Sequence, residues 1–80
     1  MNDNEIVARI DALAAEEQRL EEAHIGEGLT EAELERKREL EVTLDQLWDM
    51  LRQRRAKRHA GQDPDGAEVR PPETVERYLQ

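Results

Sequence analysis

The sequence predicts an all-α protein: an antiparallel two-helix hairpin, coiled-coil-like, with a short C-terminal helix docked back on it. The first observation is the spacing of Leu40, Leu44, Leu47 and Leu51, which are four, three and four residues apart and form one apolar seam on a helix. The second is the short connection at residues 26–28, where either glycine suits the left-handed end of a helix. A connection this short makes the helices on its two sides antiparallel neighbours.

The first helix is expected over residues 3–25. Asn2 suits the N-cap position, because Glu5 stands three residues later and completes a capping box. Asp3 and Asn4 are alternative caps, which leaves the first residue of the helix open. The apolar residues of this segment share one side of the helix: Ile6, Ile10, Leu13 and Leu20.

The second helix is expected over residues 31–60 and has the clearest start signal in the chain. Thr30 is the predicted N-cap, Glu33 is its capping-box partner, and Gly61 is the predicted stop. Folding the chain about the glycine connection leaves residues 53–60 beyond the end of the first helix. At 1.5 Å per residue, this overhang is about 12 Å long.

Glu17 is a polar residue on the otherwise apolar seam of the first helix. In the folded hairpin it is expected opposite Lys37 and Arg38. We expect an ion pair there that fixes the register of the two helices more than it adds to their stability.

Residues 62–80 are predicted to form a turn and a short helix, separate from the hairpin of residues 1–61. Residues 63–66 have the Asp-Pro-Asp-Gly composition of a tight turn, and Pro72 suits the first position of a helix. A helix this short is not stable alone, so we expect it to dock beside Trp48. Its apolar residues share one side: Val75, Tyr78 and Leu79.

Size and charge narrow the class of protein. A chain of 80 residues without cysteine buries only about 60% of its unfolded surface and has no disulfide to stabilise it. We therefore expect a homodimer in which two hairpins form a four-helix bundle.

The net charge is −8, and residues 1–35 alone carry −9, which opposes non-specific binding to nucleic acid or to an anionic membrane. The sequence has no recognisable signal peptide or membrane-spanning segment, so we expect a cytoplasmic location.

One apolar and basic block is the predicted interaction surface. Trp48 and Met50 border the leucine seam, which therefore presents more apolar surface than the first helix covers. Residues 52–59 follow with a net charge of +5. We expect these cations to meet an acidic protein surface, because guanidinium groups bind carboxylates through paired hydrogen bonds. The residues predicted to make dimer or partner contacts are Leu44, Leu47, Trp48, Leu51, Arg52, Arg54, Arg55 and Arg58.

Two motifs resemble parts of metal sites. Glu21 and His24 have the Glu-x-x-His spacing of di-iron bundles, which need a second such pair and two more glutamates. Residues 63–66 resemble part of a calcium loop, but Gly61 and Pro72 stand where further acidic ligands are required. We predict no metal and no cofactor. In a homodimer, the glutamates of a di-iron site would come from Glu16, Glu17, Glu33 or Glu35.

Catalysis is not expected. The chain has neither Cys nor Ser, and Thr30, Thr43 and Thr74 have no evident activating base. His59 lies within the cationic run. We predict that the protein is not an enzyme.

The block at residues 44–56, Leu-Asp-Gln-Leu-Trp-Asp-Met-Leu-Arg-Gln-Arg-Arg-Ala, resembles a family of small actinobacterial proteins, the domain of unknown function 2630. The similarity extends to residues 16–20, 63–65, 69–71 and 78–80. The resemblance implies short, acidic, helical proteins and brings no established activity with it.

The leading interpretation is a non-enzymatic cytoplasmic protein–protein interaction module or small regulator. The alternative is a nucleic-acid-associated factor that uses the Arg-rich end of the second helix. A dimeric metal-binding bundle is the third.

Overall fold

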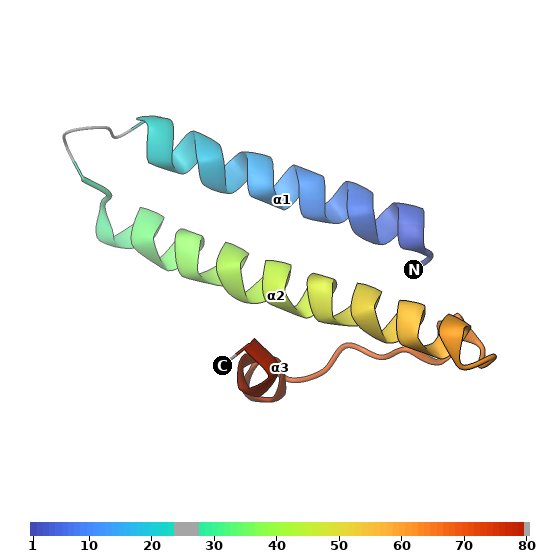
Figure 1. The fold of residues 1–80 in the computed structure, drawn as a ribbon. Coiled ribbons are helices and arrows are strands. Elements are labelled where there is room, and N and C mark those ends of the chain that lie inside the picture. The colour runs from blue at the N-terminus through green and yellow to red at the C-terminus, as the bar shows by residue number, and fades with distance from the viewer. Residues whose placement is uncertain (24–27, 80) are drawn as a thin grey trace.

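The computed structural model describes residues 1–23 and 28–79, with residues 78 and 79 described by their backbone alone. The elements follow in the order α1 (Asp3–Ala23), α2 (Glu31–His59), the 3-10 turn η1 (Pro64–Gly66) and α3 (Pro72–Leu79). Figure 1 shows α1 and α2 side by side and antiparallel, with α3 crossing the opposite side of α2. The predicted all-α fold is confirmed, and α2 is its central element.

Both long helices begin at the capping boxes predicted for them. The backbone N–H of Glu5 donates to Asn2 Oδ1 at 2.8 Å, and Glu5 Oε1 accepts from the N–H of Asn2 at 3.1 Å. Thr30 and Glu33 make the same reciprocal pair at 3.2 and 3.0 Å. These contacts satisfy N–H groups that lack partners in the first turn of a helix. The predicted end of the first helix, with His24 and Gly26, lies outside the described residues.

Gly61 ends α2 as predicted. Its φ of +75° lies in the left-handed region, which side chains disfavour. The N–H of Gly61 donates to the carbonyl of Arg58 at 3.2 Å, and that of Gln62 donates to the carbonyl of Lys57 at 2.7 Å. This pair of bonds is a Schellman motif, which caps carbonyls left open by the last turn.

The main core lies between α1 and α2. Its residues come from the two predicted seams, and Ala67 extends the cluster to the C-terminal segment. Met50 is also buried in this cluster, although the sequence suggested that it would border the seam as surplus surface. Each fully buried side chain of this kind contributes about 1.5–3 kcal/mol to folding. The buried members are Ile6, Ile10, Leu13, Leu40, Leu47, Met50, Leu51 and Ala67.

The C-terminal segment returns along α2 on the side away from α1 (Figure 1). Val75 of α3 is completely buried, which anchors the short helix. The expected docking beside Trp48 is wrong, because that side chain stays 44% exposed and the segment binds another side of α2.

Candidate interaction surface

The side of α2 that receives the C-terminal segment is polar. Gln46, Asp49 and Gln53 follow one another at spacings of three and four residues and therefore share one side of the helix. Gln46 Nε2 donates to the carbonyl of Arg70 at 3.2 Å. Gln53 Nε2 donates to the carbonyl of Glu68 at 2.7 Å, and Gln53 Oε1 accepts from the backbone N–H of Glu68 at 3.4 Å. Two glutamines thus bind the extended backbone of residues 68–70.

Asp49 completes this contact with a charge. Its side chain is 1% exposed and accepts two hydrogen bonds from Arg70, at 2.8 Å from Nε and 2.5 Å from Nη2. Gln53 Nε2 donates a third at 3.0 Å. The Arg70 guanidinium, assisted by Gln53, holds the pKa of Asp49 below its ordinary value, although burial alone would raise it. This contact, the Asp49–Arg70 clamp, was not predicted from the sequence. The sequence pattern that indicates it is the polar residues at positions i, i+3 and i+7 on one side of α2.

Arg54 is buried, and it is not part of a free overhang as predicted. Its side chain is 5% exposed, and its Nε donates to Asp3 Oδ1 at 2.5 Å. Its Nη1 donates to the Pro64 carbonyl at 3.2 Å and to Asp65 Oδ1 at 3.0 Å. Arg54 therefore joins the start of α1, the end of α2 and the turn η1.

Asp3 also binds Arg58, whose Nη1 lies 3.0 Å from Oδ2. Hydrogen bonds from Arg58 and Arg54 lower the pKa of Asp3 from 3.8 to about 2. Two of the cations predicted to meet an acidic protein surface, on a partner subunit or on another protein, are therefore paired with the first helix of their own chain.

Ion pairs also join α1 to α2 near the other end of the hairpin. Arg36 binds Glu16 through two hydrogen bonds, at 2.5 and 2.9 Å, and Lys37 Nζ lies 3.2 Å from Glu21 Oε1. Lys37 is thus paired with Glu21 and not with Glu17 as predicted. One Glu17 oxygen is buried without a hydrogen-bond partner among the described residues. Burial, with Glu41 and Glu21 nearby, raises the pKa of Glu17.

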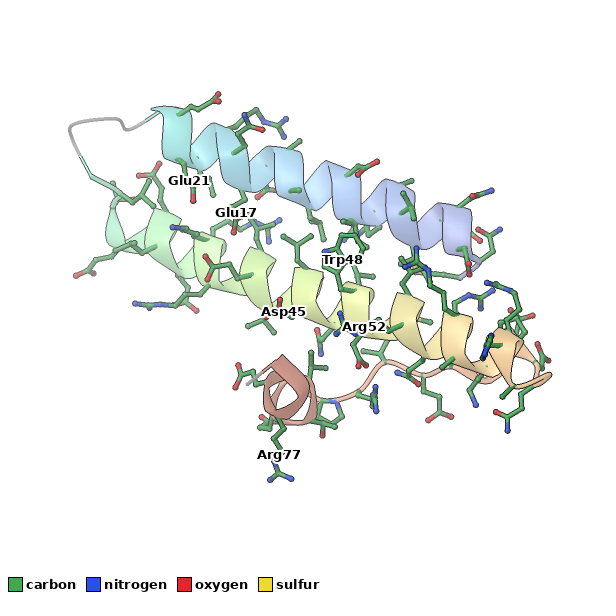
Figure 2. The ribbon with its side chains drawn as sticks, viewed as in Figure 1. Glu17, Glu21, Asp45, Trp48, Arg52 and Arg77 are labelled. Carbon is green, nitrogen blue, oxygen red and sulfur yellow. The ribbon has the colours of Figure 1, made fainter. Side chains whose placement is uncertain are left out.

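Within the described part of the chain, the third side of α2 is covered by neither α1 nor the C-terminal segment. Its residues recur at alternating spacings of three and four, and all but the half-buried Asp45 are exposed. Figure 2 shows Trp48 on the side of α2 nearer α1, with Asp45 and Arg52 nearer α3. We call this row the Trp48 stripe. It consists of Arg38, Glu41, Asp45, Trp48, Arg52, Arg55 and His59.

The charges of the Trp48 stripe nearest to the indole change sign at Trp48, while Arg38 at the far end of the stripe is paired with Glu35 at 3.6 Å. Glu41 and Asp45 precede the indole, and Arg52 and Arg55 follow it. Among the described residues, no carboxylate lies within 4 Å of Arg52 or Arg55, and no cation lies within 4 Å of Asp45. Glu41 lies 4.0 Å from Lys37. The stripe therefore combines an exposed aromatic with three charges, Asp45, Arg52 and Arg55, that have no ion-pair partner among the described residues.

A basic hollow adjoins the stripe. It has a volume of about 410 Å³ and opens between α2 and the returning segment. Arg70 contributes to it but is already bound to Asp49, so Arg52 and Lys57 supply its available positive charge. Its lining is Arg52, Gln53, Ala56, Lys57 and Arg70.

The eight residues predicted to make contacts fall into three groups. Leu47 and Leu51 are buried against α1, with Leu44 partly buried beside them, so these leucines serve the core of the single chain. Arg54 and Arg58 bind Asp3. The remaining three lie exposed on one side of α2: Trp48, Arg52 and Arg55.

Residues 1–23 and 28–79 contain no group of three or more His, Asp or Glu side chains arranged to hold a metal ion. Within the same ranges, every helix is too short or too polar to cross a membrane.

Comparisons with known proteins agree with the resemblance seen in the sequence. Residues 2–80 match a family described as "Protein of unknown function (DUF2630)". Uncharacterized proteins of Mycobacterium tuberculosis and Mycobacterium bovis are each 47% identical to the chain over 77 residues. The match covers 95% of this chain and 88% of each relative. No solved structure matches the chain.

Proposed function

The chain belongs to the DUF2630 family of proteins of unknown function, and we propose that it acts as a non-enzymatic protein–protein interaction module that binds through the Trp48 stripe. The observation that carries this proposal is the exposure of Trp48, which is 44% accessible in the middle of α2. Tryptophan is enriched among the residues that dominate binding energy at protein interfaces, where one large side chain fills a pocket.

The surroundings of Trp48 support the same function. The stripe lies on a 29-residue helix that is held on its other sides by α1 and by the Asp49–Arg70 clamp. A rigid helix surface loses little conformational entropy on binding. The charges on both sides of the indole supply a polar rim, which gives an interface its orientation and specificity.

The basic hollow supports the alternative, binding to nucleic acid, only in part. Its available cations are Arg52 and Lys57, while Arg54 and Arg58 are both bound to Asp3, and Arg54 also to Asp65. The net charge of −8 opposes approach to a polyanion. Titration against duplex DNA and structured RNA at physiological salt separates the two functions. Micromolar binding that Arg52→Gln abolishes, with a steep salt dependence, would support the alternative instead.

Affinity capture from a lysate of the native host tests the proposed function. The tagged full-length chain is compared with Trp48→Ala and with Val69→Ala, a control that removes an exposed apolar side chain outside the stripe. We expect at least one protein to be retained by the wild type and the control and lost with Trp48→Ala. An identical set of proteins for all three baits would overturn the proposal, provided circular dichroism shows that Trp48→Ala is folded.

A further inference from the structure

We propose that the occupant of the Trp48 stripe is the same stripe of a second copy of this chain, with the two α2 helices antiparallel about a two-fold axis at Trp48. This inference rests on the proposed function, because it names the partner of the same surface. It differs from the dimer suggested by the sequence alone, in which Leu47 and Leu51 lay at the interface. Those side chains are covered by α1.

The spacing of the stripe suits helix-to-helix packing. The alternation of three and four residues is the pattern that keeps one row of side chains facing a partner helix in a coiled coil. The stripe runs from Arg38 to His59 and therefore extends over about 30 Å at 1.5 Å per residue. The other two sides of α2 are already occupied by α1 and by the C-terminal segment.

The order of charges selects the orientation of the second copy. A two-fold axis at Trp48 reverses the direction of the partner helix, so residue i lies opposite a residue near 96 − i. Asp45 then faces Arg52 of the second copy, and Glu41 faces its Arg55. Because the axis generates each pair twice, four pairs of opposite charge result. A parallel arrangement would instead place Asp45 against Asp45 and Arg52 against Arg52.

Three of these four charges, Asp45, Arg52 and Arg55, have no ion-pair partner among the described residues, while Glu41 lies 4.0 Å from Lys37. Arg36, Arg54 and Arg58 are bound to carboxylates of α1 at 2.5–3.0 Å. Arg52 and Arg55 have no such partner among the described residues, which distinguishes the stripe from the rest of the basic run. A closed two-fold contact pairs Glu41 and Asp45 of each copy with Arg55 and Arg52 of the other, whereas a head-to-tail contact would leave one of these sets open.

Trp48 supplies the apolar centre of this contact. Two indoles meet near the axis, surrounded by the charged pairs, which is the arrangement of a central anchor within a polar rim. With one large apolar side chain from each copy, we expect a dissociation constant in the micromolar range. The resulting dimer has the two α2 helices in the middle and the two α1 helices outside.

Sedimentation velocity over concentrations from about 1 to 500 μM tests the dimer directly. We expect the wild type to change from monomer to dimer within this range. Trp48→Ala should weaken association about thirtyfold or more. Arg52→Asp should weaken it by about tenfold, since two attractive pairs become repulsive. The double variant Asp45→Arg with Arg52→Asp restores both pairs with their signs exchanged and should recover most of the affinity.

Cysteine cross-linking tests the orientation, because the chain contains no cysteine. Asp45→Cys mixed with Arg52→Cys should form a mixed disulfide, and neither variant alone should form a disulfide efficiently. Efficient linkage of Asp45→Cys to itself would contradict the antiparallel arrangement. A wild type that remains monomeric at 500 μM, or a dimer unaffected by both Trp48→Ala and Arg52→Asp, would overturn the inference. A monomer that still captures a host protein through Trp48 would leave the proposed function standing without this partner.

Discussion

Replacing Asp49 with Asn removes the charge that binds Arg70 while it preserves the shape of the side chain. The two hydrogen bonds from Arg70 lose their ionic partner. The new amide keeps one acceptor oxygen, but its NH2 group now meets N–H donors of Arg70 and Gln53. Breaking a fully buried ion pair costs about 3–5 kcal/mol. Arg70 is 32% exposed and regains water, so we expect a smaller loss, about 2–3 kcal/mol.

Chemical and thermal unfolding followed by circular dichroism measures this loss. At about 4–8 °C per kcal/mol for a chain of this size, the melting temperature should fall by roughly 10–20 °C. Asp11→Asn is the matched control, because Asp11 is exposed and changes the net charge by the same amount. A double-mutant cycle with Arg70→Gln should show that most of the effect depends on Arg70. A loss equal to that of the control would refute the clamp as the contact that holds the C-terminal segment.

Three further substitutions test the rest of the structure. Leu51→Ala should lower the free energy of unfolding by about 2–5 kcal/mol, measured by denaturant titration, because Leu51 is 1% exposed. The lowered pKa of Asp3 stabilises the fold above its ordinary value of 3.8, and this contribution is lost as the pH falls towards about 2. Melting temperatures measured across that range should therefore fall less steeply in Asp3→Asn than in the wild type. The pKa of Glu17 is raised, so its effect on stability is opposite to that of Asp3. The Glu17 carboxylate lowers the stability of the fold once the pH rises above 4.5. Glu17→Gln should stabilise the protein at pH 7 by roughly 0.5–2 kcal/mol, and a stability equal to or below that of the wild type would count against the buried charge.

The hairpin could be predicted from the sequence because its signals are local. The spacing of the leucines, the capping boxes at Asn2 and Thr30 and the stop at Gly61 each depend on residues within one or two turns of one another. The structure has all of them where the pattern places them.

The polar contacts could not be predicted in the same way, because their partners are distant in the chain. Asp49 binds Arg70 only because η1 reverses the chain and residues 68–70 run extended along α2. Arg54 was placed beyond the first helix by simple pairing about the glycine connection. Its long side chain instead reaches Asp3, and the turn brings Asp65 to the same guanidinium. Helical periodicity shows which residues share one side of a helix. It does not show which charged residue from a distant part of the chain will pair with them.

The exposure of Trp48 likewise depended on where the C-terminal segment docked. The sequence indicated an apolar surface beside the leucine seam. It also indicated a short C-terminal helix that must pack against another element, and this helix was expected to cover that surface. In the structure the C-terminal segment packs against the side of α2 that carries Gln46, Asp49 and Gln53. Trp48 therefore remains exposed.

Fluorescence of Trp48 reports directly on the proposed dimer, because Trp48 is the single tryptophan of the chain and lies at the centre of the proposed interface. Its emission maximum and its quenching by acrylamide are measured as the wild type is diluted from about 500 to 1 μM, the range used for sedimentation. We predict a red shift and stronger quenching on dilution, with a midpoint that matches the dimer dissociation and moves to higher concentration in Arg52→Asp. Emission and quenching that stay constant across the whole range would contradict the burial of Trp48 between two copies of the chain.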